Sequence, residues 1–212
     1  MSQMKPSLGY YRRLTAADQP QFEAHLLRLD VESRRNRFGG AVSETFLRDY
    51  AARAFALDGV IFGYVEDGEL RAAGELRVLT DDVEREAEAA FSVEADWRRR
   101  GVASGLFQRI IDAARNRRIK RILVICLPNN QGMRALTRKF DGDIERLGAD
   151  MLGVVTTPRA NLFSRWREMA DDAVGFAAAI FETQRTLANL SPLRARRRAL
   201  ESKSEERERL SA

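Results

Sequence analysis

A strand, a tight turn and a helix follow one another between residues 86 and 116, and the turn carries residue types that bind anions. The first N–H groups of a helix have no partner within the helix and carry partial positive charge, so they attract phosphate. Gly101 and Ala103 let phosphate oxygens approach the backbone, although the pattern also fits an ordinary helix start. We predict a pyrophosphate site at Arg98, Arg99, Arg100, Gly101, Val102, Ala103 and Ser104.

Hydrophobic patterning predicts the elements that position this turn. Strand–helix–strand alternation on both sides of the turn favours a parallel crossover inside a mixed sheet. Leu106, Phe107 and Ile110 recur with helical spacing after the turn, and the next apolar run is typical of a buried strand. The predicted elements are a strand at 86–94, a helix at 102–116, a strand at 121–127, a helix from Asn130 to about Phe140, and strands near 143–147 and 150–156.

The N-terminal part supplies two more helices and a hairpin. Helical spacing predicts helices at 16–30 and 43–55, for which Thr15 and Ser43 are candidate N-caps. Asp67-Gly68 is a turn signal between two runs of alternating residues, which predicts a hairpin. Together with a short strand at 9–14, these elements predict the α/β (α+β) fold class.

The C-terminal part differs in character from the rest. Residues 159–190 have an apolar stripe that predicts an amphipathic helix, which either covers the sheet or pairs with a second subunit in a homodimer. Residues 191–212 are charged and are expected to be a solvated helix end or disordered. We therefore divide the chain into a domain at 1–158, a helix at 159–190 and a tail at 191–212.

Composition excludes several classes of protein. The chain has 212 residues, of which 44% are hydrophobic, which suits one domain with a full core. No segment reaches the roughly 18 apolar residues of a membrane span, and the N-terminus lacks the apolar run of a secretory signal. The net charge of +5 arises from 36 basic and 31 acidic residues that are mostly interspersed, so nucleic-acid binding is not expected. A single cysteine favours a cytoplasmic setting.

Two motifs connect the chain to a known family. The turn reads Arg98-x-x-Gly101-x-Ala103, and Asn130-x-x-Met133-x-x-Leu136-x-x-x-Phe140 follows downstream. They resemble the coenzyme A pyrophosphate loop and the second motif of the GNAT superfamily of acetyltransferases. The resemblance covers residues 9–157 and implies a largely antiparallel mixed sheet with a β-α-β-α core that binds acetyl-CoA. It further implies that the backbone of Phe91 and Val93 contacts the cofactor arm, as does Asn130 unless it serves only as a helix cap.

A narrower resemblance is to the catalytic domain of bacterial protein-lysine acetyltransferases. It rests on Ala87-Glu88, Asp96-Trp97, Asn130-x-x-Met133 and the segment Glu32-Ser33-Arg34-Arg35-Asn36-Arg37-Phe38. The chain departs from that pattern at Arg98-Arg99, where Gln-Gly is usual, and at Asp141-Gly142, where Gly-Phe is usual. Thr137 stands where many GNAT enzymes have the tyrosine that protonates the departing thiolate, so no tyrosine acid is available there.

Glu88 is the candidate general base. A lysine amine with a pKa of about 10.4 is neutral in only about one molecule in a thousand at physiological pH, so a base must remove its proton. Glu88 stands where the lysine-acetylating subgroup has its glutamate. Strand alternation places Glu88 opposite Phe91 and Val93, which also fits a surface residue, unless a bulge changes the phase. Glu86 and Glu94 are the alternatives.

Other chemistry has weaker support. Cys126 and His25 are far apart in the sequence, so a buried thiol and a packing or surface histidine are expected rather than a nucleophile–base pair. One cysteine and one histidine cannot form a zinc cluster, so no metal is expected.

The sequence thus predicts an N-acetyltransferase that moves an acetyl group from acetyl-CoA to a primary amine by direct attack. The amine is a small molecule or a protein lysine: an open groove beside Glu88 would favour a peptide, and a closed pocket a small amine. The alternative is a catalytically weak acyl-CoA-binding sensor or interaction protein, which Thr137 keeps open.

Overall fold

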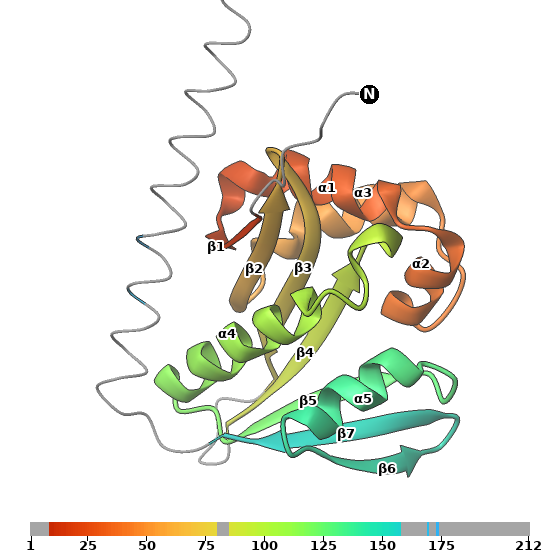
Figure 1. The fold of residues 1–212 in the computed structure, drawn as a ribbon, viewed down its shortest axis with the longest axis vertical. Helices are drawn as coiled ribbons and strands as arrows, with labels where there is room; N and C mark the ends of the chain where they lie inside the picture. Colours follow the sequence, from red (N-terminus) through yellow and green to blue (C-terminus); the bar gives the residue numbers. More distant parts are fainter. Residues whose placement is uncertain (1–8, 80–84, 158–168, 170–172, 174–212) are drawn as a thin grey trace, which may run out of the picture. The chain divides into compact units, whose positions relative to one another are not determined.

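The computed structural model describes residues 9–79, 85–157, Met169 and Ala173 (Figure 1). The described strands form one sheet in the order β1-β2-β3-β4-β5-β7-β6. Its neighbours are antiparallel except β4 and β5, which run parallel. The strands are β1 (Tyr10–Leu14), β2 (Gly59–Glu66), β3 (Glu69–Val78), β4 (Glu86–Val93), β5 (Arg121–Cys126), β6 (Asp143–Leu147) and β7 (Asp150–Thr156).

The helices divide between the two faces of the sheet. Helices α4 and α5 pack on one face, and α1 and α3 pack on the other, where they cover the half that contains β1, β2 and β3. The described helices are α1 (Gln19–Arg28), α2 (Val31–Phe38), α3 (Glu44–Ala54), α4 (Val102–Asn116) and α5 (Gln131–Lys139), with short 3-10 turns η1 (Ala16–Asp18) and η2 (Ala95–Trp97). None of the described helices is long and apolar enough to cross a membrane.

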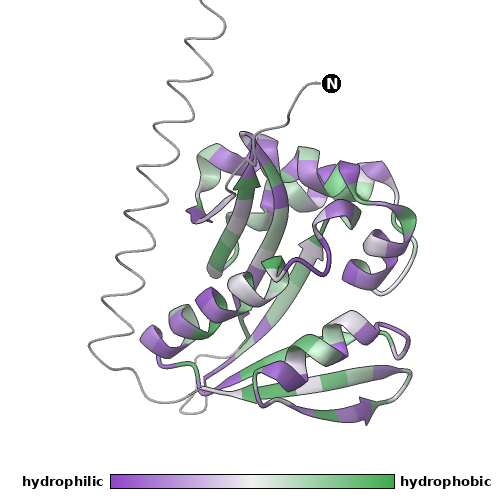
Figure 2. Cartoon of the chain, viewed as in Figure 1, coloured by the Kyte–Doolittle hydropathy of each residue, from purple (hydrophilic) through white to green (hydrophobic). Residues whose placement is uncertain are grey.

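Each face has its own hydrophobic core. On the α4 face, Leu106, Phe107 and Ile110 of α4 are fully buried against β2, β3 and β4. On the other face, Phe22 and Leu26 of α1 and Leu47 of α3 are fully buried. Figure 2 shows apolar residues dominating β2 and β3 and alternating with polar ones along α4, as expected for a helix with one buried side.

The predicted elements are confirmed with one omission and one correction. The hairpin, the helix 102–116 and the last two strands lie where the patterning predicts them. Helix α2 was missed because Val31–Phe38 is mostly charged and shows no apolar period. The predicted helix 16–30 is wrong at both ends: Thr15 caps the 3-10 turn η1, and α1 ends at Arg28 because Leu29 is extended. Asp30 then caps α2 by accepting the Ser33 N–H.

Strands β4 and β5 separate after three residue pairs. Their parallel ladder joins Glu86 to Arg121, Ala87 to Ile122 and Glu88 to Leu123, and both strands then continue without pairing to each other. The β3–β4 ladder, in contrast, runs without interruption to Val93. The sheet therefore opens between β4 and β5 beyond Glu88, and the turn after β4 and helix α4 begin at this opening.

The C-terminal predictions lie outside the described residues. The amphipathic helix at 159–190 and the tail at 191–212 are represented only by Met169 and Ala173, both of which are helical and exposed. The domain boundary at 158 therefore stays a prediction.

Phe107 provides a test of the core. Its ring is fully buried and contacts Phe91 and Phe140 at centroid distances of 5.1 and 4.8 Å, so it joins α4 to β4 and to the end of α5. Phe107→Ala should lower the free energy of unfolding by about 3–5 kcal/mol in urea denaturation. The control Phe46→Ala removes a ring that is 41% exposed, and should cost about 1 kcal/mol or less. Equal losses would contradict this account.

Candidate functional site

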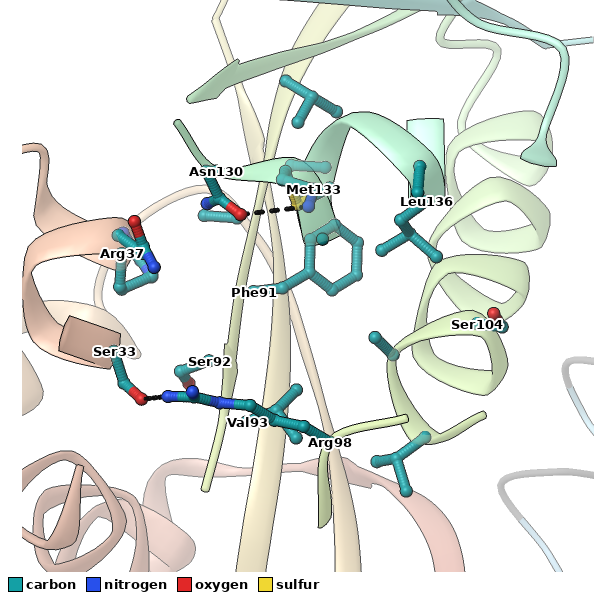
Figure 3. A pocket seen from close by; sticks show the side chains of 18 of the residues that line it. Ser33, Arg37, Phe91, Ser92, Val93, Arg98, Ser104, Asn130, Met133 and Leu136 are labelled. Carbon is teal, nitrogen blue, oxygen red and sulfur yellow. Dashed lines mark hydrogen bonds between the residues drawn. The ribbon is translucent and has the colours of Figure 1, made fainter. Parts of the chain in front are cut away.

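A cavity of about 420 Å³ lies where β4 and β5 separate (Figure 3). Helix α2 forms one wall, and the first turn of α4 together with α5 forms the other. Its lining includes all the residues of β4 from Glu88 to Val93. The predicted site residues in the lining are Glu88, Phe91, Val93, Arg98, Arg99, Gly101, Val102, Ala103, Ser104 and Asn130.

The N-terminus of α4 opens into this cavity. Gly101 is the N-cap residue in the left-handed conformation, with φ of 81°, and no side chain of the described residues caps the helix. The first α-helical bond runs from Gly105 N–H to Gly101 C=O, which leaves the N–H groups of Val102, Ala103 and Ser104 without partners inside the helix. A Cβ at Gly101 would meet no atom within 4 Å, so the space above this backbone is open. Such an arrangement suits an anion.

The three arginines of the turn have different environments. Arg98 donates to Asp30 Oδ2 at 2.9 Å and to Ser33 Oγ, so it ties the turn to the start of α2 (Figure 3). Arg99 is exposed and lines the cavity. Arg100 is not part of the cavity lining, and its guanidinium lies 5.9 Å from the centre of the Trp97 ring. Of the three side chains, Arg99 is therefore the cation placed for a ligand.

A further cation was missed in the sequence. Lys139, in the last turn of α5, lines the cavity and donates to Ser104 Oγ at 3.0 Å, which places its ammonium group beside the start of α4. Its spacing could have revealed it, because it follows the cavity residue Leu136 by three positions on the same helix.

Glu88 lines the cavity from the other side of the sheet. The uninterrupted β3–β4 register places Glu88 and Ser92 on one face, and Phe91 and Val93 on the face that packs against α4. The bulge that would have changed this phase is therefore absent from the described ladder. Glu88 reaches the cavity nevertheless, because β4 loses its neighbour β5 at this residue.

The alternative carboxylates are already engaged. Glu86 Oε1 accepts from Arg121 at 2.6 Å. Glu94 accepts from Arg28 at 2.9 Å and is bonded to His25 and Arg71 as well. Glu88, in contrast, has no ion pair or hydrogen bond between its side chain and another described residue. Among the three carboxylates, it is the one whose oxygens are open to a ligand.

His25 is the centre of a buried network beneath Ser92. The imidazole is fully buried, with Nδ1 3.1 Å from Glu94 Oε1 and Nε2 2.9 Å from Ser92 Oγ. Because a carboxylate only accepts, Nδ1 carries the proton and the Ser92 hydroxyl donates to Nε2. The network therefore fastens α1 to the end of β4. The sequence left His25 as a surface or packing residue, although its spacing from Phe22 places it on the buried stripe of α1.

A second buried network supports the α2 wall. Glu75 of β3 is 1% exposed and accepts from Arg37 and Arg77, each at 2.6 Å, and from Tyr50 at 2.7 Å. Burial and the nearby Glu75 raise the pKa of Tyr50 to about 12, so its hydroxyl stays protonated as a donor. Burial opposes the charge of Arg37, but Glu75 outweighs it and raises the pKa of the guanidinium. Sequence patterning missed this cluster because its members are distant in the chain.

The remaining candidates have structural roles in part or in full. Asn130 lines the cavity and also caps α5, by accepting from Met133 N–H at 3.0 Å, so both expectations for it are compatible (Figure 3). Thr137 is buried, donates to Met133 C=O at 3.0 Å and packs against Gly142 and Gly153. It is not part of the cavity lining.

The cysteine and metal expectations concern chemistry outside the cavity. Cys126 is buried, and burial raises the pKa of its thiol. His25 bonds Ser92 and Glu94 instead of Cys126. Among the described residues, no group of three or more metal-ligating side chains comes together.

The His25 network predicts a dependence of stability on pH. Burial lowers the pKa of His25 below its ordinary value of 6.5, although Glu94 opposes this effect. The unfolded chain therefore binds a proton below about pH 6.5 while the folded chain does not. The stability of the folded protein should therefore fall as the pH drops below about 6.5, by up to about 1.4 kcal/mol per pH unit.

His25→Gln isolates this contribution. The variant should be less stable at every pH, but its stability should change less over this range, as measured by urea denaturation. The buried carboxylates have pKa values below 4.5 and titrate at lower pH. Equal pH slopes in both proteins would show that His25 is not the titrating group.

The sequence and the fold are similar to those of known acetyltransferases. The family model of the GNAT acetyltransferases matches residues 24–142, which is more than half of the chain. The GNAT domain of S. lividans PAT is similar in fold, with 23% identity and a TM-score of 0.60 over 69% of this chain and 89% of that one. The PaiA N-acetyltransferase of Thermoplasma acidophilum, solved with coenzyme A, has 15% identity and a TM-score of 0.55 over 70% and 99%.

A third structure has the same fold. The ribosomal-protein-S5-alanine acetyltransferase of Vibrio fischeri has 13% identity and a TM-score of 0.58 over 72% of this chain and 97% of that one. These three likenesses show a shared fold. The chain belongs to the GNAT acetyltransferase family.

Proposed function

We propose that this protein transfers an acetyl group from acetyl-CoA to a primary amine by direct attack. The observation that carries the proposal is that one cavity contains both the open N-terminus of α4 and the unengaged carboxylate of Glu88. The first suits a phosphorylated cofactor and the second suits an amine that must lose a proton. Membership of the GNAT family supports the pairing.

The cavity residues fit coenzyme A along its length. The N–H groups of Val102, Ala103 and Ser104, with Arg99 and Lys139, would hold the pyrophosphate. Beyond Glu88 the β5 side of β4 is unpaired, so the backbone of Phe91 and Val93 can bond an extended arm as an added strand would. Bound acetyl-CoA would supply the thioester carbonyl that the amine attacks.

Glu88 would prepare the amine. Its carboxylate can accept the proton of an ammonium group that enters beside β4, and the proton is then held on Glu88 while the neutral nitrogen attacks. Covalent catalysis through Cys126 is not needed, since its thiol is buried and protonated at neutral pH.

The acceptor class and a second function remain to be separated by experiment. The acceptor is a protein lysine or a small amine, and the cell compartment we expect is the cytoplasm. The second candidate, a catalytically weak acyl-CoA sensor, is favoured by Thr137, whose hydroxyl is bonded to the backbone of α5 and cannot protonate a thiolate in the cavity. A screen of acetyl-CoA consumption with amines, peptides and lysate proteins should detect turnover. Tight cofactor binding without turnover would support the sensor.

Glu88→Gln tests the general base. With the best amine from the screen, the turnover rate should fall by about a hundredfold or more, while cofactor affinity stays the same. The loss should shrink as pH rises from 6 to 9, because more of the substrate amine is already neutral. Glu86→Gln is the control, since it lies two residues away on the same face but is paired with Arg121. A Glu88→Gln enzyme with the original rate throughout would end this assignment.

Gly101→Val tests the pyrophosphate site. The added side chain occupies the open space above the α4 N-terminus, so coenzyme A affinity measured by calorimetry should fall at least tenfold, or about 1.4 kcal/mol. Gly148→Val is the control because Gly148 also has positive φ, 60° against 81°, and open space around its Cβ position. Both variants carry similar backbone strain, but only the first should lose affinity. Equal affinities in folded proteins would remove the cofactor assignment.

A further inference from the structure

Strands β5, β6 and β7 carry apolar side chains on a face against which no described helix packs a hydrophobic core. Helix α5 packs on the opposite face of β5, β6 and β7, beside Ile122, Val124 and Val155. The alternate residues of these strands point the other way. We call this surface the open face, and its apolar members are Leu123 and Ile125 of β5, Leu147 of β6, and Leu152 and Val154 of β7.

The exposure of these side chains is unusual for their type. Ile125 and Leu147 are 47% and 50% exposed, while Leu123, Leu152 and Val154 are partly exposed. They are neighbours through the register, which joins Leu123 to Val154 and Ile125 to Leu152. Contiguous exposed apolar side chains of this kind mark surfaces that bind a partner.

Three carboxylates border the apolar residues on the β6 side of the open face. Asp143 and Glu145 of β6 and Asp150 of β7 lie on the same face, and Asp143 and Glu145 are exposed. None of the three forms an ion pair with a described residue. The nearby cation on this face, Arg121, is paired with Glu86. The open face is therefore acidic although the chain as a whole has a charge of +5, so its complement is cationic.

The open face is continuous with the cavity. The register runs from Glu88 to Leu123, then to Val154 and then to Asp143, so the four residues form one row across four strands. With strands about 4.8 Å apart, Asp143 lies about 14 Å from Glu88 along this row. Ile125 belongs to the open face and also lines the cavity. A molecule on the open face can thus present an amine to Glu88.

We propose that the open face docks a cationic, partly apolar polypeptide segment whose lysine enters the cavity beside Glu88. The proposal rests on the proposed function, since it names the acceptor of that reaction. Apolar side chains of the segment cover Leu123, Ile125, Leu152 and Val154, and its arginine or lysine side chains meet Asp143 and Glu145. A short amine cannot reach from Glu88 to Asp143 and Glu145, and it has no apolar side chains to cover the apolar residues of the open face.

Peptide binding tests the surface directly. The probes are two fluorescent peptides of about nine residues, each with one lysine between leucine and valine residues. One peptide also carries two arginines, and the other carries two glutamates. Binding to the full chain with coenzyme A present is measured by fluorescence anisotropy. The arginine peptide should bind at least about tenfold more tightly. Asp143→Lys with Glu145→Lys should abolish this preference.

A matched pair controls for net charge. Asp49→Lys with Asp58→Lys makes the same charge change at exposed positions on and after α3, and should keep the preference. Equal binding of both peptides, or an equal loss in both double variants, would overturn the proposal. The proposal would also fail if the Asp143→Lys/Glu145→Lys protein had a lower melting temperature but unchanged peptide binding. That result would mean that the open face is covered by this chain or by a second copy.

Acetylation assays distinguish the docking surface from the proposed acetyltransferase function. The arginine peptide should be acetylated with a higher kcat/KM than the glutamate peptide and than propylamine, a short monoamine, and the Asp143→Lys/Glu145→Lys variant should lose this advantage mainly through KM. If propylamine is the better substrate, or if both peptides react equally, the open face is not the acceptor surface while the acetyltransferase function stands. If the arginine peptide binds but no amine is acetylated, the docking surface stands while the proposed function fails.

Discussion

The separation of β4 from β5 is the constraint on which the site depends. Three residue pairs join the strands, and beyond Glu88 the β5-facing backbone groups of β4 have no strand partner. Buried N–H and C=O groups need hydrogen bonds, so this edge is suited to a polar, extended ligand. The same separation lets side chains from both faces of the sheet reach one cavity, which is why Glu88 and Phe91 both line it although they point to opposite faces.

Two buried ionic networks stabilise the structure around the opening between β4 and β5. Glu75 is surrounded by Arg37, Arg77 and Tyr50, and Glu94 by His25, Arg28 and Arg71. A buried carboxylate is costly without such partners, and losing one partner would leave an uncompensated charge. The networks bind α1, α2 and α3 to β3 and to the end of β4. The α2 wall of the cavity is therefore held in position by several hydrogen bonds and ion pairs.

The turn before α4 is also connected to the α2 wall of the cavity. Arg98 belongs to the turn before α4, yet its guanidinium binds Asp30, the residue that caps α2. On the other wall, Thr137 fits against Gly142 and Gly153, where an ideal Cβ at either glycine would already meet its methyl group closely. A tyrosine would not fit in this packing. In the proposed reaction, the proton for the departing thiolate would therefore come from another group or from solvent.

Local sequence was sufficient for much of the fold. Helix α4, the hairpin and the last two strands follow from apolar periodicity and turn residues, because these signals lie within a few residues of each other. The turn that carries the predicted anion site was predictable for the same reason, since Gly101, Ala103 and the start of α4 are adjacent. Helix α2 was not predictable in this way, because Arg37 and Ser33 obtain their partners from β3 and from the turn before α4.

Tertiary structure decided which of the candidate site residues are engaged by other side chains. Local patterning could not divide the roles of Arg98, Arg99 and Arg100, and only the family resemblance favoured Glu88 over Glu86 and Glu94. The residues that engage these side chains come from distant segments. The buried position of His25 between Ser92 and Glu94 likewise depends on packing α1 against β4. The sequence by itself determined the fold class and the strand–turn–helix before and within α4 through local patterns. The position of Glu88, unpaired among the described residues, and the acidic open face arise only when the strands pair in register.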